Sequence, residues 1–202
     1  MEKNSAMKRT FFERLEDVLC RAESEPEITY PDLRVASVLV PLTEGAGSVL
    51  VVLSKRTDIV PHHKGQVCFP GGSREPNDDS LLDTALREAE EEMGILRGDV
   101  KILGRMEAVP TMTKFIVTPY VCAVPVNYHF TPDTFEVDEV FTVPLGTFLD
   151  FSQYRMTETV FKGDPYPVFF IDVSDWTIWG ATAKILRKFA ELVKEGGLDG
   201  YL

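Results

Sequence analysis

The sequence predicts one α/β domain in which helices enclose a β-sheet. Two features indicate this class: short runs rich in β-branched residues, typical of buried strands, and stretches whose apolar residues recur at helical spacing. The series runs through the chain without an internal repeat or a low-complexity linker. A chain of 202 residues is long enough for one sizeable core, so we expect a single domain over residues 1–202.

The N-terminal part predicts a helix followed by a hairpin. From Arg9 to Ala22 the apolar residues follow a helical spacing with a polar back face, so a helical extension is expected over about residues 6–24. The runs 34–41 and 48–53 are rich in β-branched residues and are joined by Gly45-Ala46-Gly47. This pattern indicates two buried strands that form a hairpin.

The rest of the chain predicts a loop, a second helix, further strands and a final helix. The loop covers residues 58–73, and the helix runs from about Ser80 to Met93, where Gly94 stops it. Strands are expected at 101–109, 117–126, 154–161 and 167–171, with a short helix after Pro144. An apolar stripe that includes Trp179 predicts the last helix over about residues 176–194 and places this tryptophan in the core.

The overall charge limits the partners of the protein. The formal net charge is −11, which argues against nucleic acid and anionic membranes because both would be repelled at long range. No apolar run approaches the ~20 residues that span a bilayer, and the N-terminus lacks a signal-peptide core, so a cytoplasmic location is expected. Cys20, Cys68 and Cys122 are far apart and flanked by apolar residues, which indicates reduced thiols in the core.

The negative charge is concentrated in one segment. Between Glu75 and Glu92 lie eight acidic residues and one basic residue, Arg87. On the expected helix Glu88 lies beside both Glu91 and Glu92, because positions three and four apart share a face. Carboxylates this close repel one another, so a compensating cation is expected between them. Oxygen ligands without histidine or cysteine nearby favour Mg²⁺ or Mn²⁺, and Arg87 can pair with Glu91 and hold it in place.

A glycine pair precedes the acidic helix and completes a familiar motif. Phe69-Pro70-Gly71-Gly72 allows the backbone to approach a phosphate or a metal closely. These glycines and Arg87-Glu88-Ala89-Glu90-Glu91-Glu92-Met93-Gly94-Ile95 resemble the Nudix box, Gly-x5-Glu-x7-Arg-Glu-U-x-Glu-Glu-x-Gly-U with U apolar. The second half matches at every defined position. In the first half, Asp79 stands eight residues before Arg87 in place of Glu, and Gly72 is one residue further away than usual.

This resemblance implies a fold and a set of functional residues. The fold is a Nudix-like α/β/α sandwich with a mixed β-sheet between helices, in which residues 71–95 form the Nudix box region. The metal ligands are Glu88, Glu91 and Glu92, and Arg87 belongs to the same catalytic group.

Further segments are similar to the coenzyme A pyrophosphatase branch of this family. Leu53-Ser54-Lys55-Arg56-Thr57 and His63-Lys64-Gly65-Gln66-Val67-Cys68-Phe69-Pro70-Gly71-Gly72 look like its extra signature, although Pro61 stands where that signature often has Arg. The branch also carries the longer spacing in the box, with Asp where Asp78 stands. Residues 136–145 and 178–183 are similar to the same branch.

The branch resemblance implies a substrate. The expected reaction cleaves the diphosphate of coenzyme A or its derivatives to 3′,5′-ADP and 4′-phosphopantetheine, or to acyl-phosphopantetheine. Arg56 and Lys64 are bases that can pair with phosphate oxygens, and either Trp176 or Trp179 could stack on adenine. The residues expected to contact this small molecule are Arg56, Lys64, Gly65, Phe69, Gly71 and Gly72.

The chemistry expected is metal-assisted hydrolysis. Bound Mg²⁺ or Mn²⁺ lowers the pKa of water and clamps the phosphate oxygens, and a carboxylate then orients or deprotonates the attacking water. The sequence leaves this base open between Glu88, Glu92, Glu136 and Glu139.

The sequence leaves two alternative functions and a possible homodimer open. The protein could be a Nudix pyrophosphatase for ADP-ribose, dinucleoside polyphosphates or modified nucleotides. It could also be a non-catalytic nucleotide-binding module, although the presence of all three helix glutamates speaks against this. A homodimer could form through Phe11, Phe12 and the C-terminal residues 198–202.

Overall fold

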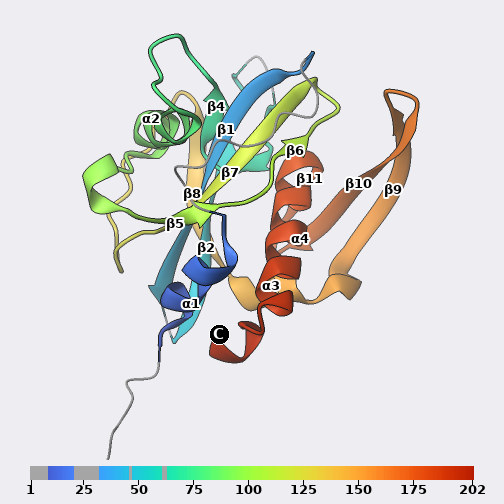
Figure 1. The fold of residues 1–202 in the computed structure, drawn as a ribbon. Helices are drawn as coiled ribbons and strands as arrows, with labels where there is room; N and C mark the ends of the chain where they lie inside the picture. Colours follow the sequence, from blue (N-terminus) through green and yellow to red (C-terminus); the bar gives the residue numbers. More distant parts are fainter. Residues whose placement is uncertain (1–8, 21–31, 46, 61–62) are drawn as a thin grey trace, which may run out of the picture.

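A mixed eight-stranded sheet forms the centre of the computed structural model, which describes residues 9–20, 32–45, 47–60 and 63–202. Its strands are β1 (Arg34–Gly45), β2 (Ser48–Arg56), β3 (Val67–Cys68), β4 (Gly71–Ser73), β5 (Lys101–Arg105), β6 (Val109–Pro110), β7 (Phe115–Ala123) and β8 (Val137–Pro144). The main path runs β3–β2–β1–β7–β5, with β4 on β1, β6 on β7 and β8 on β2 (Figure 1). β1 and β7 pair in parallel, and the other pairs described are antiparallel.

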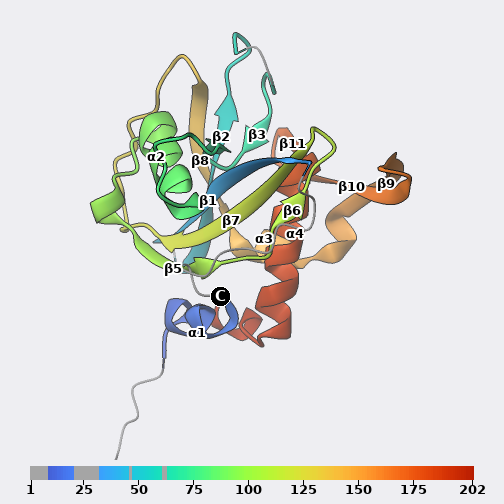
Figure 2. The same cartoon turned by 45° about the horizontal axis from the view of Figure 1, so that its top comes forward.

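Helices cover both faces of this sheet. α2 (Leu81–Met93) packs on one face, where Ala85, Ala89 and Met93 are buried with Leu39 of β1. α1 (Phe11–Val18), α3 (Leu145–Leu149) and α4 (Gly180–Glu195) contribute to a larger core that takes in the other face (Figures 1 and 2). Single 3₁₀ turns occur at Arg97–Asp99, Phe151–Gln153 and Asp199–Tyr201. The expected α/β/α sandwich with a mixed sheet is therefore confirmed.

A second, smaller sheet lies beside α4. It contains β9 (Tyr154–Phe161), β10 (Asp164–Val173) and β11 (Trp176–Trp179) in the order β11–β10–β9, all antiparallel. The strands expected at 154–161 and 167–171 thus exist, but they pair with each other and with β11. The β9–β10 hairpin projects away from the main sheet (Figure 1).

The expected start of the last helix is wrong. Residues 176–179 form strand β11, and the helix begins only at Gly180. The strand is held by aromatic contacts: the Trp176 ring stacks on Phe141 with centroids 4.1 Å apart, and the Trp179 ring stacks on Phe170. Trp179 is 43% exposed, so its expected place in the core is also wrong.

The N-terminal helix is shorter than expected. α1 begins after Thr10, whose hydroxyl accepts from the Glu13 amide while the Glu13 carboxylate accepts from the Thr10 amide. It ends at Val18, because Cys20 leaves the helix to pair with the Arg105 backbone. Residues 6–8 and 21–24 of the expected extension lie outside the described residues.

Other N-terminal and C-terminal expectations change with this packing. Cys20 is exposed and therefore is not a core thiol, whereas Cys122 is buried. Phe11 is buried and Phe12 packs against the core, as do Tyr201 and Leu202. These side chains pack within the chain, and a homodimer through them stays a prediction.

No helix of the described residues is long and apolar enough to cross a membrane.

Candidate active site

Helix α2 holds its acidic face next to strand β4. Ser80 starts the helix by accepting from the Asp83 amide, and Gly94 ends it with a φ of +68°, a conformation that glycine adopts at little cost. The helical repeat then places Ala85, Ala89 and Met93 in the core and leaves the glutamates toward β4 and solvent. The expected bounds of this helix agree with the structure to within one residue.

Strand β4 approaches this acidic face closely because of its glycines. A side-chain carbon at Gly72 would lie 2.3 Å from Oε1 of Glu88, so no larger residue fits without moving the carboxylate. The Gly71 amide donates to Oε2 of Glu92 at 3.0 Å. β4 itself is held on β1 by the pairing of Gly71 with Val38. Gly71 and Gly72 thus form a cradle for two carboxylates of α2.

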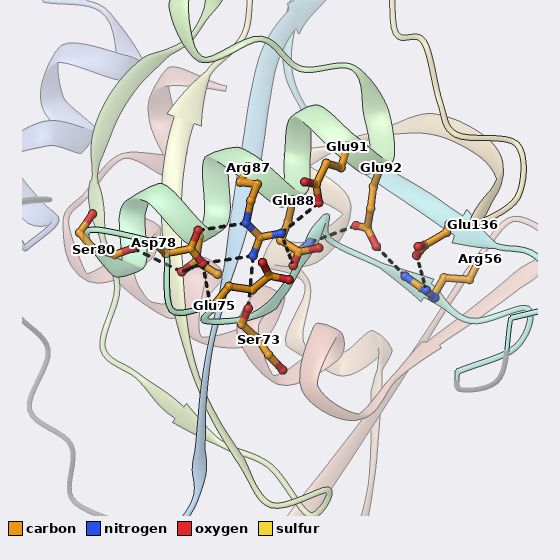
Figure 3. A network of polar contacts seen from close by, with 12 residues as sticks. Arg56, Ser73, Glu75, Asp78, Ser80, Arg87, Glu88, Glu91, Glu92 and Glu136 are labelled. Carbon is orange, nitrogen blue, oxygen red and sulfur yellow. Dashed lines mark hydrogen bonds and ion pairs between the residues drawn. The ribbon is translucent and has the colours of Figure 1, made fainter.

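Arg87 organises the upstream half of the site. Its Nε and Nη2 donate to the two carboxylate oxygens of Asp78 at 3.0 and 3.1 Å, and its Nη1 donates to Glu88 and to Glu91, each at 3.0 Å (Figure 3). Asp78 is buried, and hydrogen bonds from Arg87 lower its pKa to about 2. The expected Arg87–Glu91 pair is confirmed.

The acid of the first half of the motif is Asp78. Asp79, the neighbour that stands eight residues before Arg87, is exposed and offers its backbone carbonyl to Arg74. Asp78 therefore takes the place of the glutamate in the first half of the box. The one additional residue in this box lies between Asp78 and the start of α2.

Glu92 is the most buried of the three expected metal ligands. The exposed fraction of its side chain is 6%, against 18% for Glu88 and 59% for Glu91. Burial raises the pKa of Glu92 to about 7, although Arg56 and the Gly71 amide oppose the rise. Burial also raises the pKa of Glu88, against the effect of Arg87.

A second arginine links Glu92 to a distant acid. Nη1 of Arg56 donates to Oε1 of Glu92 at 2.6 Å, and Nη2 donates to Oε2 of Glu136 at 2.8 Å (Figure 3). Arg56 ends β2 and Glu136 directly precedes β8, which pairs with β2. Glu139, the other candidate base on this segment, is exposed on β8. Of these two candidate bases, Glu136 therefore contacts a residue of the site through Arg56, whereas Glu139 is an exposed residue of β8.

The carboxylate oxygens of α2 are the type of donor that a hard divalent cation prefers. Glu88 and Glu92 present carboxylate oxygens toward the same glycine pair, and Glu91, which is more exposed, contacts Arg87 (Figure 3). As the side chains stand, the described part of the chain contains no group of three His, Cys, Asp or Glu residues that could hold a metal. Arg56 and Arg87 pair with these carboxylates instead.

A cavity of about 290 Å³ lies beside Arg56 and Gly71, which both bond Glu92. Arg56 and Gly71 line its end at the site. Its other walls include residues of the segment 63–69, of β10, of β11 and the start of α4, and residues 111–113. Three large side chains on these walls are Met112, Tyr166 and Trp179. The lining is mainly apolar, which suits the organic part of a nucleotide-like ligand.

The expected substrate contacts divide into two groups. Arg56, Gly71 and Phe69 line the cavity, although Phe69 is only 4% exposed. Lys64 and Gly65 are not part of its wall, and Lys64 is exposed. Pro61, at the departure from the branch signature, lies outside the described residues.

Sequence reasoning missed part of the cavity wall. Met112, between β6 and β7, and Tyr166, on β10 of the second sheet, carry no sequence signal, because only the tertiary fold brings them to the cavity. The segment around Trp179 did carry a signal, since its resemblance to the coenzyme A branch pointed to it. His63 makes a hydrogen bond to Gln66 at 2.8 Å, which holds the loop together.

Comparison with known proteins identifies a family for this chain. Residues 33–161 match the family described as the NUDIX domain. The chain is 38% identical over 160 residues to the uncharacterized Nudix hydrolase NudL of Yersinia pestis (strain Pestoides F), covering 79% of this chain and 80% of that protein. The NudL protein of Yersinia pseudotuberculosis (serotype O:1b, strain IP 31758) matches with the same values.

The fold has a counterpart among solved structures. A Caenorhabditis elegans Ap4A hydrolase, solved as a binary complex, superposes with a TM-score of 0.53 at 17% identity and covers 81% of this chain and 99% of that chain. At this identity the likeness concerns the fold alone. Together with the sequence match, the site defines a hydrolase of the pyrophosphatase class. The chain belongs to the Nudix hydrolase family.

The Asp78–Arg87 pair predicts unequal effects for two neighbouring substitutions. Asp78→Asn removes the charged partner of a partly buried guanidinium, so we expect the free energy of unfolding to fall by roughly 2–3 kcal/mol. Asp79→Asn changes an exposed acid and should cost less than about 0.5 kcal/mol. Urea denaturation of both variants measures the difference, and equal losses would contradict the assignment of Asp78.

The raised pKa of Glu92 predicts a pH-dependent stability in metal-free protein. A carboxylate whose folded pKa, about 7, exceeds its ordinary value of 4.5 stabilises the fold below pH 4.5, and this contribution is lost as the pH rises to 7. Glu92→Gln does not titrate. The stability of the wild type relative to this variant should therefore fall by up to about 3 kcal/mol across this range. Denaturation in the presence of chelator measures it, and a constant difference would refute the shift.

Proposed function

We propose that this Nudix enzyme hydrolyses the diphosphate of coenzyme A or its derivatives, with Mg²⁺ or Mn²⁺ as cofactor. The observation that carries the proposal is the continuity between the carboxylates of α2 and an apolar cavity: Arg56 and Gly71 contact both. A diphosphate at the glycine pair would place one organic arm of the substrate in the cavity. The similarity of residues 53–57 and 63–72 to the coenzyme A branch supports this substrate.

The residues of the site have separate roles in this proposal. Glu88, Glu91 and Glu92 bind the cation, which when bound lowers the pKa of water and neutralises charge on the phosphate oxygens. Arg87 keeps Glu88 and Glu91 oriented, since it donates to both and is itself fixed by Asp78. Glu136, which is 40% exposed and reaches the site through Arg56, is our candidate for the group that takes the proton from water.

Trp179 gives the cavity a surface for a planar group. The ring stacks on Phe170 with an interplanar angle of 10° and is 43% exposed, so it is held in place and remains partly accessible. Adenine has the flat shape that such a ring binds. We therefore assign the adenine arm of the substrate to this wall.

The direct experiment is incubation of the protein with coenzyme A and Mg²⁺, followed by mass analysis. We expect 3′,5′-ADP and 4′-phosphopantetheine in equal amounts. Glu92→Gln should remain folded and lose turnover by about 100-fold or more, because it removes a ligand of the cation. Cleavage of ADP-ribose or dinucleoside polyphosphates in preference to coenzyme A would overturn the substrate assignment.

The cavity wall predicts a change in substrate affinity. Loss of the stacking surface in Trp179→Ala should raise KM for coenzyme A about tenfold with kcat nearly unchanged, while Trp179→Phe should keep most of the affinity. Steady-state kinetics and competition by 3′,5′-ADP measure both effects. A normal KM in the alanine variant would exclude Trp179 from the binding site.

A further inference from the structure

Arg56 is the one side chain, among the described residues, that makes ion pairs with both Glu92 and Glu136. The two acids lie on different elements, one on α2 and the other in the turn before β8. The two bonds use different nitrogens of the same guanidinium, at 2.6 and 2.8 Å, and Figure 3 shows the group in contact with both carboxylates. A single cation thus joins an expected metal ligand to the candidate base.

Both carboxylate oxygens of Glu92, an expected metal ligand, already have hydrogen-bond partners. Oε2 of Glu92 is already engaged by the Gly71 amide, and Oε1 is engaged by Arg56. The side chain is 6% exposed, so water gives its charge little compensation and a nearby cation stabilises the charged form. A divalent ion bound at Oε1 would repel the guanidinium and compete with it for this oxygen.

We propose that Arg56 is a positioning residue that serves as the resident cation of the site before metal binds. It holds Glu92 and Glu136 together, and it releases Glu92 when a divalent ion takes its place. This inference rests on the proposed function only in its assumption that α2 binds a metal. Arg56 also lines the cavity, so the released guanidinium faces the space where the diphosphate would lie.

The proposal has a consequence that is independent of catalysis. Metal binding must break the Arg56–Glu92 pair, so part of the affinity for metal is used to displace the arginine. Removal of the arginine should therefore tighten metal binding, whereas an arginine that merely supported the fold around the ligands would weaken it when removed. The two roles predict opposite signs.

The test is calorimetric titration of chelator-stripped protein with Mn²⁺, without substrate. Arg56→Met should bind Mn²⁺ about tenfold more tightly than the wild type. In chelator it should melt at a lower temperature than the wild type, and Mn²⁺ should raise its Tm by more. Lys55→Met is the matched control: it removes the same charge from the neighbouring residue, whose partner is the exposed Asp138, and should leave the affinity unchanged.

Three outcomes would contradict the proposal or separate it from the proposed function. Unchanged or weaker Mn²⁺ binding in folded Arg56→Met overturns it. If that variant fails to fold, Arg56→Lys decides. A lysine ammonium cannot make both contacts of the guanidinium, so the Arg56→Lys protein should bind Mn²⁺ about threefold more tightly than the wild type. Equal or weaker binding by this variant overturns the proposal. A protein that shows the tightening yet does not cleave coenzyme A would support this role of Arg56 and refute the substrate alone.

Discussion

Burial of carboxylates against a glycine pair is the constraint on which the site depends. Glu88 and Glu92 lie next to Gly71 and Gly72, where water is scarce, and a buried charge must be compensated. Two arginines supply this compensation from opposite ends: Arg87, tied to Asp78, and Arg56, tied to Glu136. The acidic residues of α2 are thereby paired with basic residues from inside and outside the helix.

Much of this arrangement follows from local sequence, and the rest depends on tertiary contacts. The acidic helix is predictable because Ser80 and Gly94 cap a regular apolar pattern. β4 is not, since a three-residue glycine-rich strand has no alternation of its own and exists only through its pairing with β1. Residues 176–179 continue the apolar spacing of α4. Only tertiary contacts, the pairing with β10 and the ring of Phe141 on β8, show that this segment is a strand.

The same limit applies to the functional residues. The three helix glutamates can be grouped from spacing alone, and the resemblance to a known motif selects Arg87 with them. The exposed Lys64 and the cavity-lining Arg56 are equal candidates in the sequence, because nothing in a loop pattern tells which base turns inward. The contact between Arg56 and Glu136 requires β2 and β8 to be neighbours, a pairing that the sequence does not disclose.

The central claim is that the acids of α2 bind a divalent ion beside the cavity. A crystal of the protein soaked with Mn²⁺ tests it most directly, since the anomalous signal of manganese locates the ion without reference to activity. The account predicts a peak within bonding distance, about 2.0–2.3 Å, of carboxylate oxygens of Glu88 and Glu92. A fully soaked crystal with no peak there, and with Arg56 still bound to Glu92, would contradict it.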